Sequence, residues 1–576
     1  MDRRQSYISD DQELARLGKK QVLARRFGFW SLFGFAVCEL ITWETVLALF
    51  GQGFENGGPG GLVYGFIIAW GSTLSVYTVI SELASMAPIA AGQYYWSYIM
   101  APPRARVFVS YIIGWLTTLA WIATVATECM FAGTMLQGLL VIDYPDYSPK
   151  RWQGTLLTWL VVLVSVFFNV IIPAALPRIE IGTVVFHIAG FISIITVLWC
   201  FSPRHSADFV FATSMNEGGW STQGLSYCVG FMGNVATFVG ADASVHLAEE
   251  VSDAAVNIPR VITISMLMNG IIGFAMMVTL LFCLGDVDTV LNTTTGFPFI
   301  QVFHDNIKSI PWATVMGAII LILTWACATG ITTSASRMTW AFARDRGVPF
   351  ASTLMKVDRR TRVPIIAVGV VVMFACLLSL IYIGSSVAFN DVISLTITGF
   401  YGSYLVPSAF LLYHRVWGHI LPHEAMLVDG QPTTAEQAGD AQSLKTPVIE
   451  EKKTSPSPST SQQPDEQDND NNSNSNSDLI AYAPGQLFWG PWKVPGLLGT
   501  LNNAYACLYM IFVIFWSVWP PSQQVTASTM NYSILVTGGV ILFSVFWYYV
   551  RGHKEYVGPL VEREVVALSG ILREVV

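Results

Sequence analysis

The sequence predicts an all-α integral membrane protein with twelve membrane-spanning helices, and three observations lead to this fold class. Hydrophobic residues make up 53% of the 576 positions and charged residues only 12%, whereas soluble domains average about 25% charged residues. Apolar runs of about 20 residues, long enough to cross a bilayer, recur along the chain. Lysine and arginine are distributed very unevenly among the segments that join these runs.

The predicted spans form a group of ten followed by a group of two. The first ten cover 30–50, 62–81, 107–140, 155–172, 181–201, 225–248, 261–285, 312–336, 364–384 and 392–413, and the last two cover 496–519 and 532–550. The run 107–140 is longer than one crossing requires, so we expect that helix to tilt or to project beyond the lipid.

The basic residues predict the orientation of the chain. With a cytoplasmic N-terminus, the segments on the cytoplasmic side hold 27 of the 31 lysines and arginines and the opposite loops hold four. Cytoplasmic loops of membrane proteins carry such an excess, so we predict that both termini are cytoplasmic. The first span is too long for the apolar region of a cleaved signal peptide, and we interpret it as a retained anchor.

Composition divides the chain into five parts: a cytoplasmic tail 1–26, a ten-helix core 27–420, an acidic linker 421–484, two further helices within 485–550, and a tail 551–576. The linker includes TSPSPSTSQQPDEQDNDNNSNSNSD, which is too polar to bury a core. Residues 421–480 alone account for the net charge of −8, so the acidic composition says nothing about a substrate.

Two spans combine helix-breaking and polar residues. Many secondary transporters repeat five helices in inverted orientation, and the first helix of each half is broken near the midplane. This pattern would relate 30–50 to 225–248, where Gly240 and its neighbours could interrupt the helix and Asp242 or Ser244 could cap the next one. We therefore predict a 5+5 inverted-repeat core plus two extra helices. The alternative is that the glycines only allow close helix packing.

The stretch GFAVCELITWETVLALF at 34–50 places Glu39 and Glu44 within an apolar helix. A charged residue at the bilayer centre costs at least about 2.5 kcal/mol, so such residues normally face the bundle interior or a water-filled cavity. We predict that Glu39 faces an amine or quaternary nitrogen and that Trp43 is a cation–π partner. Glu44 is either a second functional acid or part of a structural pair.

Four motifs carry a family resemblance: GGPGGLVYG at 57–65, SELASMAPIAAGQYYW at 81–96, GADASVHLAEEVSDAAVNIPRVI at 240–262 and SRMTWAFARDRGVPF at 336–350. With these motifs the chain resembles the fungal amino acid/choline transporter family of the amino acid–polyamine–organocation superfamily. The resemblance implies a leucine-transporter-like fold and uptake of amino acids, choline or related amines, driven by protons or ions. The acidic Glu39 departs from the small polar residues common there in the family.

The predicted substrate site lies at the two interruptions, because a broken helix exposes N–H groups to anions and carbonyls to cations. Its residues are Cys38, Glu39, Thr42, Trp43, Gly240, Ala241, Asp242 and Ser244. The candidates for ion or proton coupling are Glu44, Glu128, His187, Thr332 and Thr333. The resemblance places His187 where some relatives carry a coupling lysine, although a lone histidine is often only a packing group.

Further predictions concern the edges of the core. Glu249 and Glu250 could form an inner gate with Arg344 or Arg346. Asn292 and Asn531 begin Asn-x-Ser/Thr triplets in loops predicted to lie outside, which makes them glycosylation candidates.

We expect a secondary active transporter, a permease that works by alternating access, with proton coupling as the expected mode and sodium as the alternative. The expected partners are a small amine or amino acid, the coupling ion and the lipid bilayer, with no nucleic acid and no cofactor. The plasma membrane is the expected location. Alternatives are a transporter-like nutrient sensor and a carrier of a cationic secondary metabolite such as an alkaloid.

An enzyme is the contrasting class. The only histidine-rich stretch contains His414, His419 and His423, and Pro422 interrupts it. Membrane di-metal oxygenases need several such clusters, and the remaining histidines are scattered, so we predict neither a metal site nor an enzyme.

Overall fold

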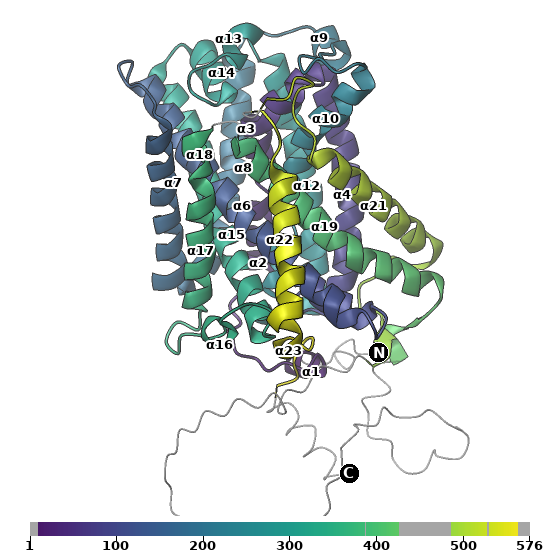
Figure 1. Cartoon of the computed structure of the whole chain (residues 1–576). Helices are drawn as coiled ribbons and strands as arrows, with labels where there is room; N and C mark the ends of the chain where they lie inside the picture. Colours follow the sequence, from purple (N-terminus) through teal and green to yellow (C-terminus); the bar gives the residue numbers. More distant parts are fainter. Residues whose placement is uncertain (1–9, 386–387, 426–484, 527–528, 563–576) are drawn as a thin grey trace, which may run out of the picture.

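The computed structural model describes residues 10–385, 388–425, 485–526 and 529–562 (Figure 1). In this part of the chain the fold is a bundle of helices, eleven of which are long and apolar enough to cross a membrane. The all-helical membrane fold is therefore confirmed, while the count of twelve spans stays a prediction. Most of the predicted linker, 426–484, lies outside the described residues.

The long helices follow the predicted spans closely. They are α2 (Phe29–Leu40) continued by α3 (Thr42–Glu55), α4 (Gly58–Met86), α6 (Arg106–Asp143), α7 (Arg151–Val166), α8 (Leu176–Phe201), α12 (Ala254–Phe282), α15 (Ile310–Arg344), α17 (Ile365–Ser379), α19 (Ala388–Val416), α21 (Gly496–Ser517) and α22 (Ser533–Trp547). The predicted span 225–248 is divided into α10 (Gln223–Ala236), α11 (Ala243–His246) and a 3₁₀ turn at Ala248–Glu250, so no single helix covers it.

Short helices lie at the two ends of the bundle. One end carries α1 (Asp10–Arg16), α16 (Ala351–Leu354) and α23 (His553–Glu555), and we call it the terminal face because both ends of the described chain lie there (Figure 1). The other end, the opposite face, carries α9 (Ala207–Ala212), α13 (Val287–Leu291) and α14 (Pro298–Ile307). A further helix, α5 (Gln93–Met100), packs against α6 and α19.

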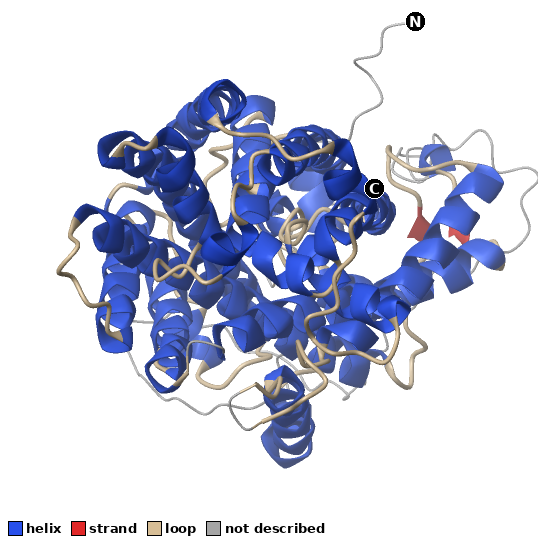
Figure 2. Ribbon diagram, turned by 90° about the horizontal axis from the view of Figure 1, so that it is seen from above, coloured by secondary structure: helices blue, strands red, loops and turns tan. Residues whose placement is uncertain are grey.

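Burial separates central helices from peripheral ones. In the most apolar stretch of Phe29–Glu55, 83% of the residues are buried, against 17% in Ser533–Glu555. Figure 2, which views the bundle from above, shows helices surrounding this centre and the two short strands at the periphery. These strands, β1 (Ile420–Leu421) and β2 (Leu487–Phe488), pair in parallel. The first span is therefore the one that is best shielded from lipid.

The central helix α6 is 38 residues long. At 1.5 Å per residue it measures about 57 Å, which is longer than the roughly 30 Å of hydrocarbon in a bilayer. The expected projection of this helix beyond the lipid follows from its length. It packs against α7 from the first predicted half of the core and against α15 and α19 from the second.

Both spans predicted to be interrupted are broken. Ile41 separates α2 from α3 with a φ of 27°, a strained conformation for a β-branched residue. The second break runs from Thr237 to Asp242, and Gly240 there has a φ of 110°. Glycine adopts this conformation without a steric penalty. The inverted repeat itself stays a prediction.

The two broken spans lie side by side. Near the opposite face, a Cβ on Gly53 of α3 would come within 3.2 Å of the Gly230 carbonyl oxygen in α10. Near the terminal face, Phe27 and Val251 form an isolated backbone bridge. These contacts bring the breaks at Ile41 and Gly240 together at the centre of the bundle.

Candidate functional site

A small central cavity of about 30 Å³ lies beside the two breaks. Its lining comes from α2, α3, α6, α15, α19 and the end of α10, and consists of Glu39, Leu40, Ile41, Thr45, Leu49, Thr124, Thr127, Glu128, Phe131, Ala236, Val239, Ile331, Ile393, Thr396 and Ile397. This volume holds one or two water molecules. A larger ligand therefore requires the surrounding helices to separate.

Two carboxylates face this cavity from different helices. Glu39 of α2 is 2% exposed, and neither of its carboxylate oxygens has a hydrogen-bond partner within the described chain. Glu128 of α6 also has one unpaired oxygen, Oε2. Gly330 of α15 provides the space for Glu39, because a Cβ there would overlap Glu39 Oε1. The site thus holds buried negative charge, or protons that neutralise it, without a protein partner.

A second, larger cavity of about 600 Å³ lies toward the opposite face. Its lining includes Gln52, Glu55, Lys150 and Arg151, as well as loop residues near that face. It shares Leu49 and Phe131 with the central cavity, so these two side chains stand between the two spaces. Its volume is typical of cavities that bind small molecules.

Ion pairs close the terminal face below the central cavity. Arg344 Nη1 lies 2.8 Å from Glu249 Oε2, so one of the two candidate arginines contacts one of the two candidate acids, while the inner gate itself stays a prediction. Glu250 pairs instead with Arg337, whose Nε lies 2.7 Å from Glu250 Oε1 and which is 1% exposed. Arg346 follows in a turn with a φ of 61° and pairs with neither carboxylate in the described structure.

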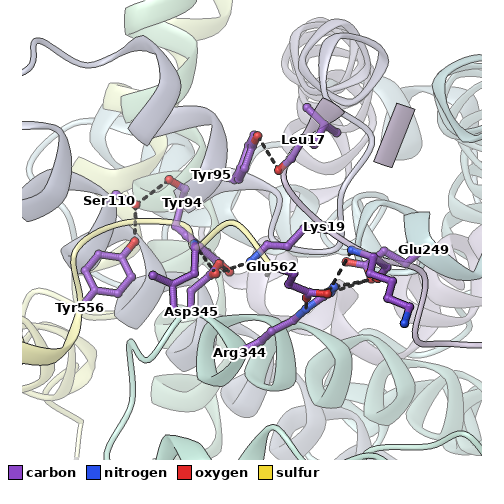
Figure 3. Close-up of polar contacts among 12 residues, drawn as sticks. Leu17, Lys19, Tyr94, Tyr95, Ser110, Glu249, Arg344, Asp345, Tyr556 and Glu562 are labelled. Carbon is purple, nitrogen blue, oxygen red and sulfur yellow. Dashed lines mark hydrogen bonds and ion pairs between the residues drawn. The ribbon is translucent and has the colours of Figure 1, made fainter. Parts of the chain in front are cut away.

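Segments from both ends of the chain cover these ion pairs, and we call residues 10–27 and 556–562 the terminal cap. Lys19 forms a buried ion pair with Asp345, which also accepts hydrogen bonds from Tyr94 OH (2.8 Å) and the Leu560 amide (2.9 Å). Figure 3 shows Lys19, Tyr94 and Asp345 converging. The two tails predicted as separate regions thus meet on one buried aspartate.

The two parts of the terminal cap also bind each other. The Glu562 amide donates to the Gly18 carbonyl at 3.0 Å, and Glu562 Oε1 accepts a hydrogen bond from Arg344 Nε at 2.5 Å. Arg344 therefore lies between Glu249 of the predicted gate and Glu562 of the cap (Figure 3). The Glu250 carbonyl accepts from the amide of Phe27 at 3.0 Å.

Side chains already occupy the polar groups at the second break. Gly240 and Ala241 donate their amides to Tyr77 OH at 3.0 and 3.2 Å. Asp242 accepts hydrogen bonds from Gln93 Nε2 (2.7 Å) and Tyr404 OH (2.5 Å). These predicted substrate-binding groups are therefore engaged within the protein.

Neighbouring hydroxyls at this break are engaged as well. Ser244 Oγ donates to the Ala241 carbonyl at 3.4 Å, and Ser334 of α15 donates to the Ala243 carbonyl at 3.2 Å. The second break is held to α15 by this bond, so α11 and α15 are linked next to the central cavity.

The acid Glu44 points away from the cavity toward α8. Its Oε1 lies 2.6 Å from His187 Nδ1, and Trp43 Nε1 donates to the same nitrogen at 3.2 Å. Glu44 and His187 are 1% and 0% exposed, and His187 Nε2 has no partner in the described chain. Trp43 belongs to this cluster and does not line the cavity.

Two further predicted substrate residues in the first span lie away from the cavity. Cys38 Sγ points toward the Glu180 carbonyl of α8 at 4.0 Å. Thr42 packs against α12, because a Cβ on Gly273 would lie 2.7 Å from its Cγ2. Only one of the eight predicted substrate residues, Glu39, lines the cavity. One residue of the predicted coupling set, Glu128, lines it as well.

The two threonines of the predicted coupling set, Thr332 and Thr333, belong to α15, which packs against the irregular end of α7. Thr333 Oγ1 donates to Asn169 Oδ1 at 2.7 Å, and Asn169 Nδ2 donates to the Thr329 carbonyl at 2.9 Å. Thr332 Oγ1 donates to the Ala328 carbonyl of its own helix at 2.7 Å. These oxygens are therefore part of helix-to-helix and within-helix hydrogen bonds.

The two predicted glycosylation sites differ in exposure. Asn292 is exposed and follows α13 at the opposite face. Asn531 is 7% exposed, and its Nδ2 donates to Ser394 Oγ and to the carbonyls of Ser517 and Trp519. Attaching a glycan to that nitrogen would break these bonds, so the structure favours Asn292 and disfavours Asn531.

Several residues at the site were missed by the sequence reasoning. Gln93, Arg337 and Asp345 lie within the motifs 81–96 and 336–350, so the motifs could have indicated them. Tyr77 and Tyr404 carry no local signal, because a tyrosine in an apolar helix resembles any packing residue.

Comparison with known proteins agrees with this arrangement. A family profile described as amino acid permease matches residues 27–423. A candidate amino acid/polyamine transporter of Macrophomina phaseolina is 30% identical over 67% of this chain and 85% of its own length. In Saccharomyces cerevisiae, a choline transporter is 27% identical (93% and 83% covered) and a GABA-specific permease is 26% identical (96% and 86% covered).

The chain belongs to the amino acid permease family. It is accordingly a multi-pass membrane transporter and not an enzyme.

The residues His414 and His419 contact each other, Nδ1 to Nδ1 at 3.2 Å, and His414 Nε2 bonds to the Met100 carbonyl. In the described residues no group of three potential ligands could hold a metal ion.

Proposed function

We propose that the protein carries a small amine or amino acid across the membrane by alternating access, with Glu39 and Glu128 in the substrate site. One observation supports this most directly. A cavity of about 600 Å³ lies on the opposite-face side of the two acids and is separated from their small cavity by Leu49 and Phe131, while ion pairs lie on the terminal-face side. Such a site, accessible from one side at a time, is what alternating access requires. The names of the relatives, choline and GABA among them, suggest the substrate class.

We further propose that the terminal face is cytosolic and that the membrane is the plasma membrane. The support for the orientation is the distribution of lysine and arginine, of which 27 of 31 fall on the side of the termini. The opposite face would then receive the substrate from outside.

Proton coupling is assigned to the pair of His187 and Glu44. A single proton between Nδ1 and Oε1 can reside on either atom, and the Trp43 bond to Nδ1 is made when the proton is on Glu44. Buried ionisable groups in membrane spans often relay protons. Because Glu44 and Glu39 belong to the two halves of the same broken span, a change of charge at Glu44 can act on the substrate site.

The test is uptake by proteoliposomes that contain the purified full chain. Radiolabelled choline, GABA and putrescine are offered with an inward proton gradient, with an inward sodium gradient, and with neither. We expect accumulation with the proton gradient only. Accumulation driven by sodium alone would refute proton coupling, and binding without accumulation under any gradient would identify a sensor.

The variant His187→Gln should separate proton coupling from the movement of substrate across the membrane. We expect it to lose gradient-driven accumulation while retaining exchange of labelled for unlabelled substrate, because the pathway stays intact. His304→Gln is the matched control, since His304 is 40% exposed on α14 at the opposite face. Full proton-driven accumulation by His187→Gln would contradict the assignment.

A further inference from the structure

We infer that the central site selects organic cations that carry no carboxylate group, held between Glu39 and Glu128. This inference rests on the proposed function for transport, but it concerns binding and can be measured separately. It narrows the proposed substrates from amines and amino acids in general to amines that carry no carboxylate.

The first argument is the charge of the lining. Glu39 approaches from α2 and Glu128 from α6, and three of their four carboxylate oxygens have no partner in the described chain. Among the described residues that line the central cavity there is no lysine, arginine or histidine. Lys150 and Arg151 line only the outer cavity. A buried carboxylate is stabilised by an opposite charge or by a proton, and none of the described lining residues supplies a positive charge, so a cationic ligand would find two acids without a basic partner.

The second argument is the direction of the threonine hydroxyls. Four threonines line the cavity, and each hydroxyl lies within hydrogen-bond distance of a carbonyl one turn earlier in the chain: Thr45 to Ile41 (2.9 Å), Thr124 to Ala120 (2.7 Å), Thr127 to Ala123 (2.9 Å) and Thr396 to Val392 (3.1 Å). The hydroxyls of Thr127 and Thr396 also lie 3.4 Å apart, where either can donate to the other. Their remaining lone pairs can only accept hydrogen bonds. The lining therefore offers acceptors to an ammonium group and few donors to a carboxylate.

The third argument concerns the place where a carboxylate would be expected. The exposed amides of a broken helix form the natural anion site, but Gly240 and Ala241 already donate to Tyr77 OH. The first turn of α3 also presents amides at the other break, and there Glu39 precedes the turn and Glu44 lies within it. The carboxylate of a zwitterionic ligand placed there would be repelled by the negative charge of these glutamates.

The remaining walls are apolar. Leu40, Val239, Ile331, Ile393 and Ile397 contribute hydrocarbon surface. Methyl or methylene groups next to the charged nitrogen match these side chains, so an alkylated or aliphatic ammonium ion fits the lining better than a strongly hydrated inorganic cation.

Two matched ligand pairs test the inference on purified full-length protein. Choline and glycine betaine share a trimethylammonium group and differ in the carboxylate, and butylamine and GABA differ in the same way. Equilibrium binding is measured by competition against labelled choline and by ligand-induced thermal stabilisation. We expect each cation to bind at least about tenfold more tightly than its carboxylate partner.

Glu39→Gln and Glu128→Gln should each weaken binding of choline and butylamine by about tenfold or more. The exposed Glu217, outside both cavities, supplies the control Glu217→Gln, which should bind as the unmodified protein does. If a glutamine variant does not fold, Gly330→Ala displaces the Glu39 carboxylate instead and should weaken the same two ligands.

The outcomes distinguish this inference from the proposed function. Equal binding within each ligand pair, or binding of none of the four, would overturn the inference while leaving transport to be judged by uptake. Selective binding of choline and butylamine without uptake would support the inference and refute the transporter assignment.

Discussion

Glu13 in the terminal cap is a carboxyl group in an unusual environment. Its side chain is 13% exposed, and burial raises its pKa to about 7, although Arg16 at 3.9 Å lowers the pKa and Asp10 raises it. The small space around it is also lined by Gln21, Arg25 and Glu249. A raised pKa means that the docked helix binds a proton more tightly than the undocked one. The contribution of Glu13 to the stability of the docked helix is fully present below pH 4.5 and is lost as the pH rises through about 7.

We therefore predict that α1 docks less firmly at pH 8 than at pH 6, with a difference on the order of 1 kcal/mol. Hydrogen exchange of residues 10–16, corrected for the intrinsic effect of pH, should be faster at pH 8. The variant Glu13→Gln should abolish this difference, because it cannot ionise. A variant that keeps the full pH dependence would show that another group is responsible.

At the scale of elements, the break between α10 and α11 depends on a side chain from another helix. Tyr77 of α4 accepts both amides of Gly240 and Ala241, which would otherwise be buried without partners. Each unpaired buried group costs roughly 1–3 kcal/mol. The interrupted helix is therefore stabilised by tertiary contacts rather than by its own sequence alone.

Tyr77→Phe should accordingly lower the free energy of unfolding by about 2–5 kcal/mol, since the ring remains and the acceptor is lost. Thermal unfolding in detergent measures this change. Tyr64→Phe is the control, because Tyr64 lies on the same helix and is 55% exposed. Equal melting temperatures for the two variants would show that water replaces the Tyr77 hydroxyl.

At the scale of the whole molecule, the two chain ends close the terminal face together. Asp345 joins Lys19 of the first segment to Leu560 of the second, and Glu562 joins Gly18 to Arg344. Separation of the Glu249–Arg344 ion pair, the predicted inner gate, requires these contacts to separate or to move as one body. The terminal cap thus adds to the stability of the closed terminal face.

A chain that ends at Glu555 should therefore show faster hydrogen exchange in residues 10–27 and faster substrate exchange in proteoliposomes. A chain that ends at Ala567 keeps all of the described cap and should behave as the full chain does. If the shorter chain leaves exchange of residues 10–27 unchanged, the second segment does not hold the first in place.

The local pattern of the sequence was sufficient for the long helices. Apolar runs predicted the positions of eleven candidate spans, with boundaries that differ from the observed ones by up to eight residues, because a bilayer demands about 20 apolar residues whatever the rest of the fold does. The run of small and polar residues at Gly240–Ser244 indicated an interruption for a similarly local reason. The pairing of Glu249 with Arg344 was within reach because both residues flank spans that end on the same side.

The tertiary structure alone decided which groups meet. Nothing near Glu44 in the sequence indicates that it pairs with His187, 143 positions away, while Glu39 of the same span lines the cavity with Glu128. Likewise Tyr77 and Gly240 are separated by 163 positions, and Lys19 and Asp345 by 326. Hydropathy describes the transfer of one helix from water into lipid, which depends on the residues of that helix alone. Which buried polar groups become partners depends on how all the helices pack, and this packing determines which acids stay without a protein partner.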